Sequence, residues 1–160
     1  LIGVREPWAA RTPRAFGGAW LTPLTADTDS RRTNDQAVLL RVELGLASIL
    51  LASDIETAAE HALVAARAPL AATVLKVAHH GGRYSSTAKF LRAVSPQAAV
   101  ISVGVVNEYG HPTPEAIGRL ERAHAQVYRT DRDGTVTVET DGARIQVTTA
   151  NGKREILRAP

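Results

Sequence analysis

The sequence predicts an α/β protein, of the α+β kind, with one mixed sheet and helices on its outer face. Two observations lead to this class. Short apolar runs typical of strands alternate with helix-like stretches in the middle of the chain, and a closing series of short strands joined by tight turns follows. The chain has 160 residues, which is enough for one domain with its own core, so we treat residues 1–160 as a single domain.

The predicted domain begins with a loop-rich part at 1–32, which contains three prolines and a Gly-Gly pair. Apolar runs at 36–44 and 47–53 then flank a glycine and predict a β-hairpin. The stretch 54–66 places apolar residues on one helical face, and Asp54 is the candidate N-cap of that helix.

A second alternation of strand and helix follows. The remaining predicted elements are strands at 73–78 and 97–105, helices at 86–94 and 113–125, and three closing strands with the sequences QVYRT, TVTVET and RIQVTT. Ser85 or Ser86 is expected to cap the first of these helices, and Thr113 the second. The sequences DRDG and DG predict turns between the closing strands. The polar tail at 151–160 is expected to fray in part.

The composition excludes several kinds of site. The chain has no cysteine, so any metal must be held by His, Asp or Glu, and a disulfide or a cysteine nucleophile is impossible. A net charge of +3 permits a polyanionic partner without requiring one. No apolar run reaches the roughly 18 residues of a membrane span. The chain begins with Leu1 rather than Met, so we expect a piece of a longer protein, soluble when isolated.

Candidate functional residues follow three predicted strands. Asp54, the adjacent pair His79 and His80, and His111 each lie just past a strand and before a helix, so they should converge at one sheet edge. Carboxylate and imidazole ligands suit Zn, Mn or Fe. Structural interpretations stay open for each: a helix cap for Asp54, a turn with one ring in the core for the histidine pair, and a backbone-bonded loop residue for His111.

The order of these pieces resembles the second half of the metallo-β-lactamase-like domain of ComEC-type DNA-internalisation competence proteins. The resemblance covers about residues 33–140 and rests on these segments in order: Asn34 with AVLLRVEL, ILLASDIETAAE, VLKVAHHGG, SST, VISVG, Asn107, YGHP and RTDRDG. Two local departures are visible. Ser53 precedes the aspartate where the family has glycine, and Gly82 stands where the family has the serine of HHGS.

The resemblance implies a fold and an activity. The fold would be the second half of an αββα sandwich, and the intact domain would hydrolyse DNA phosphodiester bonds during internalisation with two divalent ions, Zn or Mn. Asp54 would bridge the ions. His111 and one of His79 and His80 would be ligands or catalytic groups, with His79 and His80 as the catalytic candidates.

The partners implied are single-stranded DNA, a membrane channel domain and the missing N-terminal half, on the extracytoplasmic side of a bacterial inner membrane. Candidate substrate-binding residues are Lys76, Arg83, Ser85, Ser86 and Asn107.

The HxHxDH motif that supplies most metal ligands in this superfamily is absent. The chain is therefore expected to be a fragment, or else a degenerate half-domain, and to hold at most a weak metal site by itself. The alternatives are a non-catalytic module that binds DNA or a partner domain, and a metallo-hydrolase acting on a small ester or lactam. A half sandwich should also leave the inner face of its sheet open, and we expect this face to include Val38, Leu40, Leu50, Leu75, Val77 and Ile101.

Overall fold

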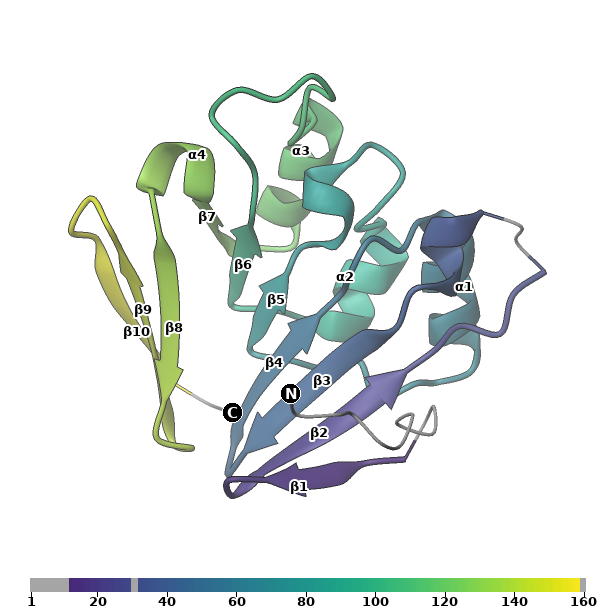
Figure 1. Ribbon diagram of the computed structural model, residues 1–160, viewed down its shortest axis with the longest axis horizontal. Helices are drawn as coiled ribbons and strands as arrows, with labels where there is room; N and C mark the ends of the chain where they lie inside the picture. Colours follow the sequence, from purple (N-terminus) through teal and green to yellow (C-terminus); the bar gives the residue numbers. More distant parts are fainter. Residues whose placement is uncertain (1–11, 30–31, 159–160) are drawn as a thin grey trace, which may run out of the picture.

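The computed structural model describes residues 12–29 and 32–158, and it confirms a mixed α/β fold (Figure 1). One sheet has seven strands whose spatial order follows the sequence order. The strands are β1 (Arg14–Phe16), β2 (Ala19–Leu24), β3 (Leu39–Leu44), β4 (Ala47–Leu51), β5 (Val74–Lys76), β6 (Ala98–Ile101) and β7 (Gln126–Arg129). Neighbours from β1 to β4 are antiparallel, as the predicted hairpin requires, and those from β4 to β7 are parallel.

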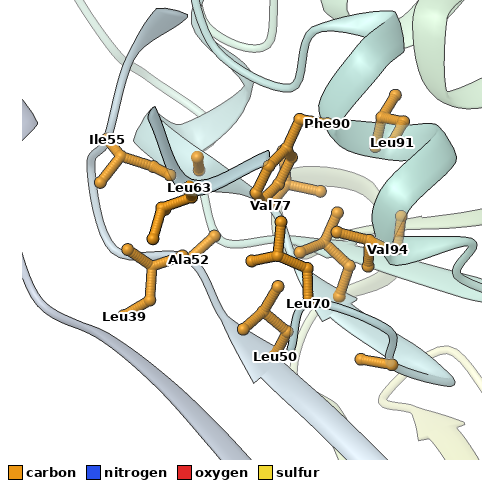
Figure 2. Close-up of a cluster of buried hydrophobic side chains, with 14 of the residues drawn as sticks. Leu39, Leu50, Ala52, Ile55, Leu63, Leu70, Val77, Phe90, Leu91 and Val94 are labelled. Atoms are coloured by element: carbon orange, nitrogen blue, oxygen red, sulfur yellow. The ribbon is translucent and has the colours of Figure 1, made fainter. Parts of the chain in front are cut away.

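Helices cover one face of this sheet (Figure 1). They are α1 (Thr57–Ala65), α2 (Ala88–Val94) and α3 (Pro114–Arg122), close to the predicted positions. Figure 2 shows part of the core between the two layers, where Leu50 and Val77 from the sheet side meet Phe90 of α2. Over residues 12–29 and 32–158, no helix is both long and apolar enough to cross a membrane.

A second, three-stranded sheet packs against the opposite face. It consists of β8 (Val136–Thr140), β9 (Arg144–Thr149) and β10 (Arg154–Arg158), in the order β10-β9-β8. Ile145, Val147 and Leu157 of this sheet form a buried cluster with side chains of β4 to β7. The tail was expected to fray, which is wrong for 154–158, because β10 pairs along its length with β9 and buries Leu157. The DRDG sequence forms a short helix, α4 (Thr130–Asp133), instead of a simple turn.

The expectation of an open inner face is wrong for most of the residues named. Leu50, Leu75, Val77 and Ile101 are fully buried in the core beneath the helices. Successive side chains of a strand point to opposite faces, and parallel strands are apolar on both, so the sequence alone did not assign each residue to a face. Of the six, Val38 is exposed and Leu40 is half-buried.

The apolar surface that stays open lies over β1 to β4, on the side away from the helices. The strand register places Phe16, Leu21, Leu40, Val42 and Leu51 on this side. Phe16 is 75% exposed and Leu51 39%, while the other three are half-buried. The three-stranded sheet packs mainly over β4 to β7 and leaves this part uncovered. We call these five residues the open face.

Two of the predicted helix caps are wrong. The N-cap position of α1 is Glu56, and the capping carboxylate is the buried Asp35 in the short 3-10 helix η1 (Thr33–Gln36). Asp35 Oδ1 accepts hydrogen bonds from the backbone N–H groups of Glu56 (3.1 Å) and Ala59 (3.3 Å). Helix α2 is capped by Thr87 instead of either serine, whereas Thr113 caps α3 as predicted. Asp54 therefore does not cap α1.

Candidate functional site

The carboxyl ends of the parallel strands β4, β5 and β6 point the same way (Figure 1). Asp54 follows β4, the histidine pair follows β5 within the 3-10 segment η2 (Ala78–Gly81), and His111 follows β6 after a loop. The structure brings all four to this edge, and it arranges them in two separate contacts instead of one cluster.

The paired histidines both have a left-handed backbone. His79 has φ 48° and ψ 42°, and His80 has φ 52° and ψ 25°. Two consecutive non-glycine residues in this region are unusual and are tolerated where surrounding contacts enforce them. Here the N–H of His79 donates to Ser53 O (3.0 Å) and the N–H of Gly82 donates to His79 O (2.8 Å). The result is that the neighbouring rings reach different carboxylates.

His79 contacts Glu56. Its Nδ1 lies 3.1 Å from Glu56 Oε1, and Arg32 Nη1 lies 2.5 Å from the other oxygen of the same carboxylate. Glu56 is only 9% exposed, so the contact is shielded from bulk water. A carboxylate at Nδ1 favours the tautomer with its proton there, which leaves Nε2 with a lone pair. Nε2 of His79 is therefore the atom available for chemistry.

His80 contacts Asp54. Its Nδ1 lies 2.6 Å from Ser102 O, and because a carbonyl can only accept, Nδ1 carries the proton. Nε2 keeps its lone pair and lies 3.7 Å from Asp54 Oδ1. Two ligands of one tetrahedral ion at usual bond lengths lie about 3.4 Å apart, so this spacing is close to that of a ligand pair. Both side chains are nearly half exposed, which leaves them accessible.

His111 packs against His79 with the ring centroids 5.4 Å apart and the planes at 81°. Asn107 holds its loop, because the Asn107 side chain accepts from His111 N and donates to His111 O, both at 3.0 Å. Burial, followed by the charges of His79 and His80, lowers the pKa of His111. Within the described residues its Nδ1 is buried without a hydrogen-bond partner, which is costly unless another group supplies one.

The other predicted binding residues differ in placement. Lys76 lies beside Asp54, and burial lowers its pKa while the Asp54 charge opposes that shift. Arg83 is exposed and forms an ion pair with Glu115 at 2.8 Å. Ser85 and Ser86 are fully buried, so the structure does not bring their hydroxyls to the accessible part of the site.

The loop after the histidines is held by two charged side chains. Glu60 of α1, fully buried, accepts hydrogen bonds from the backbone N–H groups of Ser86 and of Thr87. Arg119 of α3 donates to the carbonyl oxygens of Arg83, Ser85 and Ser86. Burial raises the pKa of Glu60 and lowers that of Arg119. The helices thus fix the loop that carries Arg83.

A cavity of about 490 Å³ opens next to these groups. Glu56, His79 and His111 line it, together with the exposed aromatic residues Tyr84 and Tyr109. The cavity therefore adjoins the His79 contact and gives it access to solvent.

The candidate metal donors in the described residues are too few for a complete site. Asp54 with His80 supplies one oxygen and one imidazole nitrogen suited to Zn or Mn, and the buried Nδ1 of His111 has no partner. In the part of the chain that the structure describes, no three His, Asp or Glu side chains are arranged to hold a metal ion. The types of donor atom fit a divalent metal, but there are too few of them, so a bound ion would need further ligands.

Sequence reasoning missed Glu56, Glu60 and Arg119 as contributors to this site. A usable sequence signal for Glu56 was present, because it is a carboxylate two residues after Asp54, just past the same predicted strand. No local signal marks Arg119, whose partners lie more than 30 residues away.

No protein-family model matches the chain. It is 34% identical over 116 residues to ComE operon protein 3 of Bacillus subtilis, covering 72% of this chain and 15% of that protein. It is 42% identical over 105 residues to competence protein ComA of Neisseria gonorrhoeae, covering 64% and 15%. It is 32% identical over 124 residues to recombination protein 2 of Haemophilus influenzae, covering 78% and 16%.

The homologues of the chain are thus competence proteins, consistent with a ComEC-type protein. The chain spans only 15–16% of the length of these relatives.

Proposed function

We propose that the chain is the C-terminal part of a metal-dependent hydrolase domain that cuts DNA phosphodiester bonds during DNA uptake. The observation that carries this proposal is the pair formed by Asp54 and Nε2 of His80 at the carboxyl edge of the sheet. The homology to competence proteins supports a role in DNA uptake, and the pair of possible metal ligands supports metal-dependent hydrolysis.

Asp54 and His80 would hold a divalent ion, Zn or Mn, with Asp54 able to bridge to a second one. A bound divalent ion would acidify a water molecule and neutralise charge on the phosphate. The Nδ1–H of His80 donates to Ser102 O, which fixes the ring and keeps Nε2 aimed at Asp54. The sequence left open which histidine is the ligand, and this geometry favours His80.

His79 would then act on protons. Glu56 holds the proton at Nδ1, so Nε2 can take up a second proton and pass it to a leaving oxygen. The carboxylate of Glu56 would stabilise the imidazolium that forms, as an acidic partner does for other catalytic histidines. His111, packed on the His79 ring, would limit its movement.

Lys76 and Arg83 would contact the phosphate backbone. Arg83 is exposed, and its ion pair with Glu115 costs little to exchange for a phosphate, because surface pairs contribute about 0–1 kcal/mol. Such contacts would make binding depend strongly on salt concentration.

The remaining ligands would come from the other half of the sandwich, packed on the open face. This face exposes Phe16 and Leu51 and half-exposes Leu21, Leu40 and Val42. Apolar residues gathered on one side of a sheet mark a surface that another layer covers. In the whole protein we propose that this domain lies beside a membrane channel domain, on the extracytoplasmic side.

A second candidate is a non-catalytic half-domain that binds DNA or a partner domain. The specific observation in its favour is the absence of three convergent metal-ligand side chains within the described residues.

Cleavage of labelled single-stranded DNA by the domain with both halves present separates the two candidates. With millimolar Mn²⁺, we expect chelator-sensitive cleavage that falls at least about 100-fold in Asp54→Ala. His124→Ala is the control, because His124 is an exposed residue past the carboxyl end of α3 and does not line the cavity beside His79. Cleavage that persists in Asp54→Ala, or that never appears, would contradict the hydrolase.

A further inference from the structure

Two exposed tyrosines stand at the cavity beside His79. Tyr84 is 61% exposed and Tyr109 is 82% exposed, and both line the same cavity as His79 and His111. The chain has only three tyrosines, so two of the three gather at this one place. Two exposed aromatic rings at one cavity offer flat apolar faces that a ligand can cover.

The tyrosines are held by the frame of the site. Tyr109 stacks on His111 with centroids 6.1 Å apart and an interplanar angle of 29°. His111 in turn meets the ring of His79 edge-on, so three rings run from the solvent-exposed rim towards the proton-transfer candidate. The backbone of Tyr84 is fixed by Thr57, whose hydroxyl donates to Tyr84 O at 2.6 Å. Neither ring sits on an unsupported segment.

The chemistry around the rings suits a nucleotide. An aromatic face binds any nucleobase by stacking, with little regard to sequence. Arg83 adjoins Tyr84 in the chain and lines the same cavity, where it can meet a phosphate. A base can reach such a face only when it is not already stacked within a duplex.

We propose that Tyr84 and Tyr109 form a nucleobase-binding subsite that holds single-stranded nucleic acid next to His79. This subsite rests on the nucleic-acid function proposed above and adds the part of the substrate that the site recognises. The chain has few aromatic residues, and the exposed placement of two of them beside one cavity is the observation that carries this proposal.

The test is oligonucleotide binding by the 160-residue chain in the presence of a chelator, followed by fluorescence anisotropy. The probes are labelled 12-mers: oligo(dT), oligo(rU), an abasic sugar-phosphate strand and a DNA duplex. We expect both single strands with bases to bind more tightly than the abasic strand and the duplex. One stacked base changes affinity about 5- to 150-fold, so a preference of at least about fivefold is expected.

Variants of the two tyrosines test whether their rings bind the bases. Tyr84→Ala with Tyr109→Ala should remove the preference for strands with bases, whereas Tyr84→Phe with Tyr109→Phe should retain it, because only the ring is needed. Trp20→Ala is the matched control, since Trp20 is an aromatic residue 55% exposed on β2 and does not line the cavity. Circular dichroism melting shows that each variant is folded.

Equal binding of the abasic strand, or an unchanged preference in the alanine variant, overturns the subsite. Because no metal is present, this result is independent of cleavage. A base preference that depends on the tyrosines, in a protein whose assembled domain cleaves nothing, would keep the subsite and refute the hydrolase.

Discussion

Glu56 Oε1 lies 3.1 Å from Nδ1 of His79, while the adjacent His80 turns to Asp54. Asp54 and Glu56 are separated by one residue, and each contacts one of the two adjacent histidines. The left-handed backbone at both histidines produces this divergence. It would separate the metal-binding role proposed for His80 from the proton-transfer role proposed for His79.

The first prediction concerns Glu56. Glu56→Gln should lower kcat for DNA cleavage by the assembled domain about 10- to 100-fold with little change in KM, because the amide no longer stabilises a protonated His79. Glu121→Gln, an exposed glutamate of α3, is the control and should cleave normally. Steady-state kinetics give both constants. An equal rise in KM with an unchanged kcat would mean that Glu56 acts in binding instead.

The second prediction concerns the stability supplied by Glu60. Glu60→Ala leaves the N–H groups of Ser86 and Thr87 buried without their acceptor, and each costs about 1–3 kcal/mol. Urea unfolding should therefore show a loss of at least about 2 kcal/mol. Glu121→Ala should change the free energy of unfolding by less than about 0.5 kcal/mol. A loss in Glu60→Ala as small as that of the control would show that the loop needs no such acceptor.

The same residue gives stability a pH dependence. Burial raises the folded-state pKa of Glu60 above the ordinary value of 4.5, so between these two pKa values the folded chain binds more protons than the unfolded chain. The Glu60 contribution to the free energy of unfolding should fall as pH rises through that window. Glu60→Gln does not titrate and should lose this component. Parallel pH profiles for the two proteins would contradict the buried, proton-favouring environment.

The open face should cause the isolated chain to associate with itself. The isolated chain should self-associate in sedimentation velocity and bind the dye ANS, because Phe16 and Leu51 expose apolar surface beside half-buried neighbours. Phe16→Ser with Leu51→Ser should reduce both signals. Val105→Ser with Val106→Ser is the control, since these valines are 80% and 92% exposed on a loop away from this face. If the control pair reduces the signals equally, the open face is not the surface responsible.

Much of the fold follows from the periodicity of apolar residues. The alternation that runs from β4 through α3 was predictable because each strand is a short apolar run and each helix begins near a polar cap or proline. The sequence did not predict which face of the sheet Leu50 and Leu75 lie on, because parallel strands are apolar on both faces. The cap of α1 was missed because Asp35 reaches it from 21 residues away, a contact that only folding creates.

The convergence of the candidate residues at one edge of the sheet was predictable from the sequence, and their arrangement there was less so. Asp54 and the histidines were found from their positions after strands, and the structure brings them to one edge. Their division into two contacts depends on backbone angles that tertiary hydrogen bonds impose, such as that from His79 N to Ser53 O. The burial of Ser85 and Ser86 likewise follows from packing against α1 and α3.

Ligand count predicts the behaviour of the chain without its other half. It should cleave single-stranded DNA little or not at all with millimolar Mn²⁺, since Asp54 and His80 would supply only two ligands and a catalytic metal site needs about three from the protein. A gel assay with labelled DNA decides this. Robust cleavage that Asp54→Ala abolishes would show that the described residues complete the site themselves.

The most direct test of the account is Mn²⁺ binding to the assembled domain, measured by electron paramagnetic resonance of the free ion. His80→Ala should weaken metal binding at least about tenfold, because it removes the nitrogen 3.7 Å from Asp54 Oδ1. His79→Ala should bind Mn²⁺ as the unmodified domain does and yet cleave DNA at least about 100-fold more slowly. Loss of metal binding in His79→Ala with normal binding in His80→Ala would contradict the assignment of the two histidines.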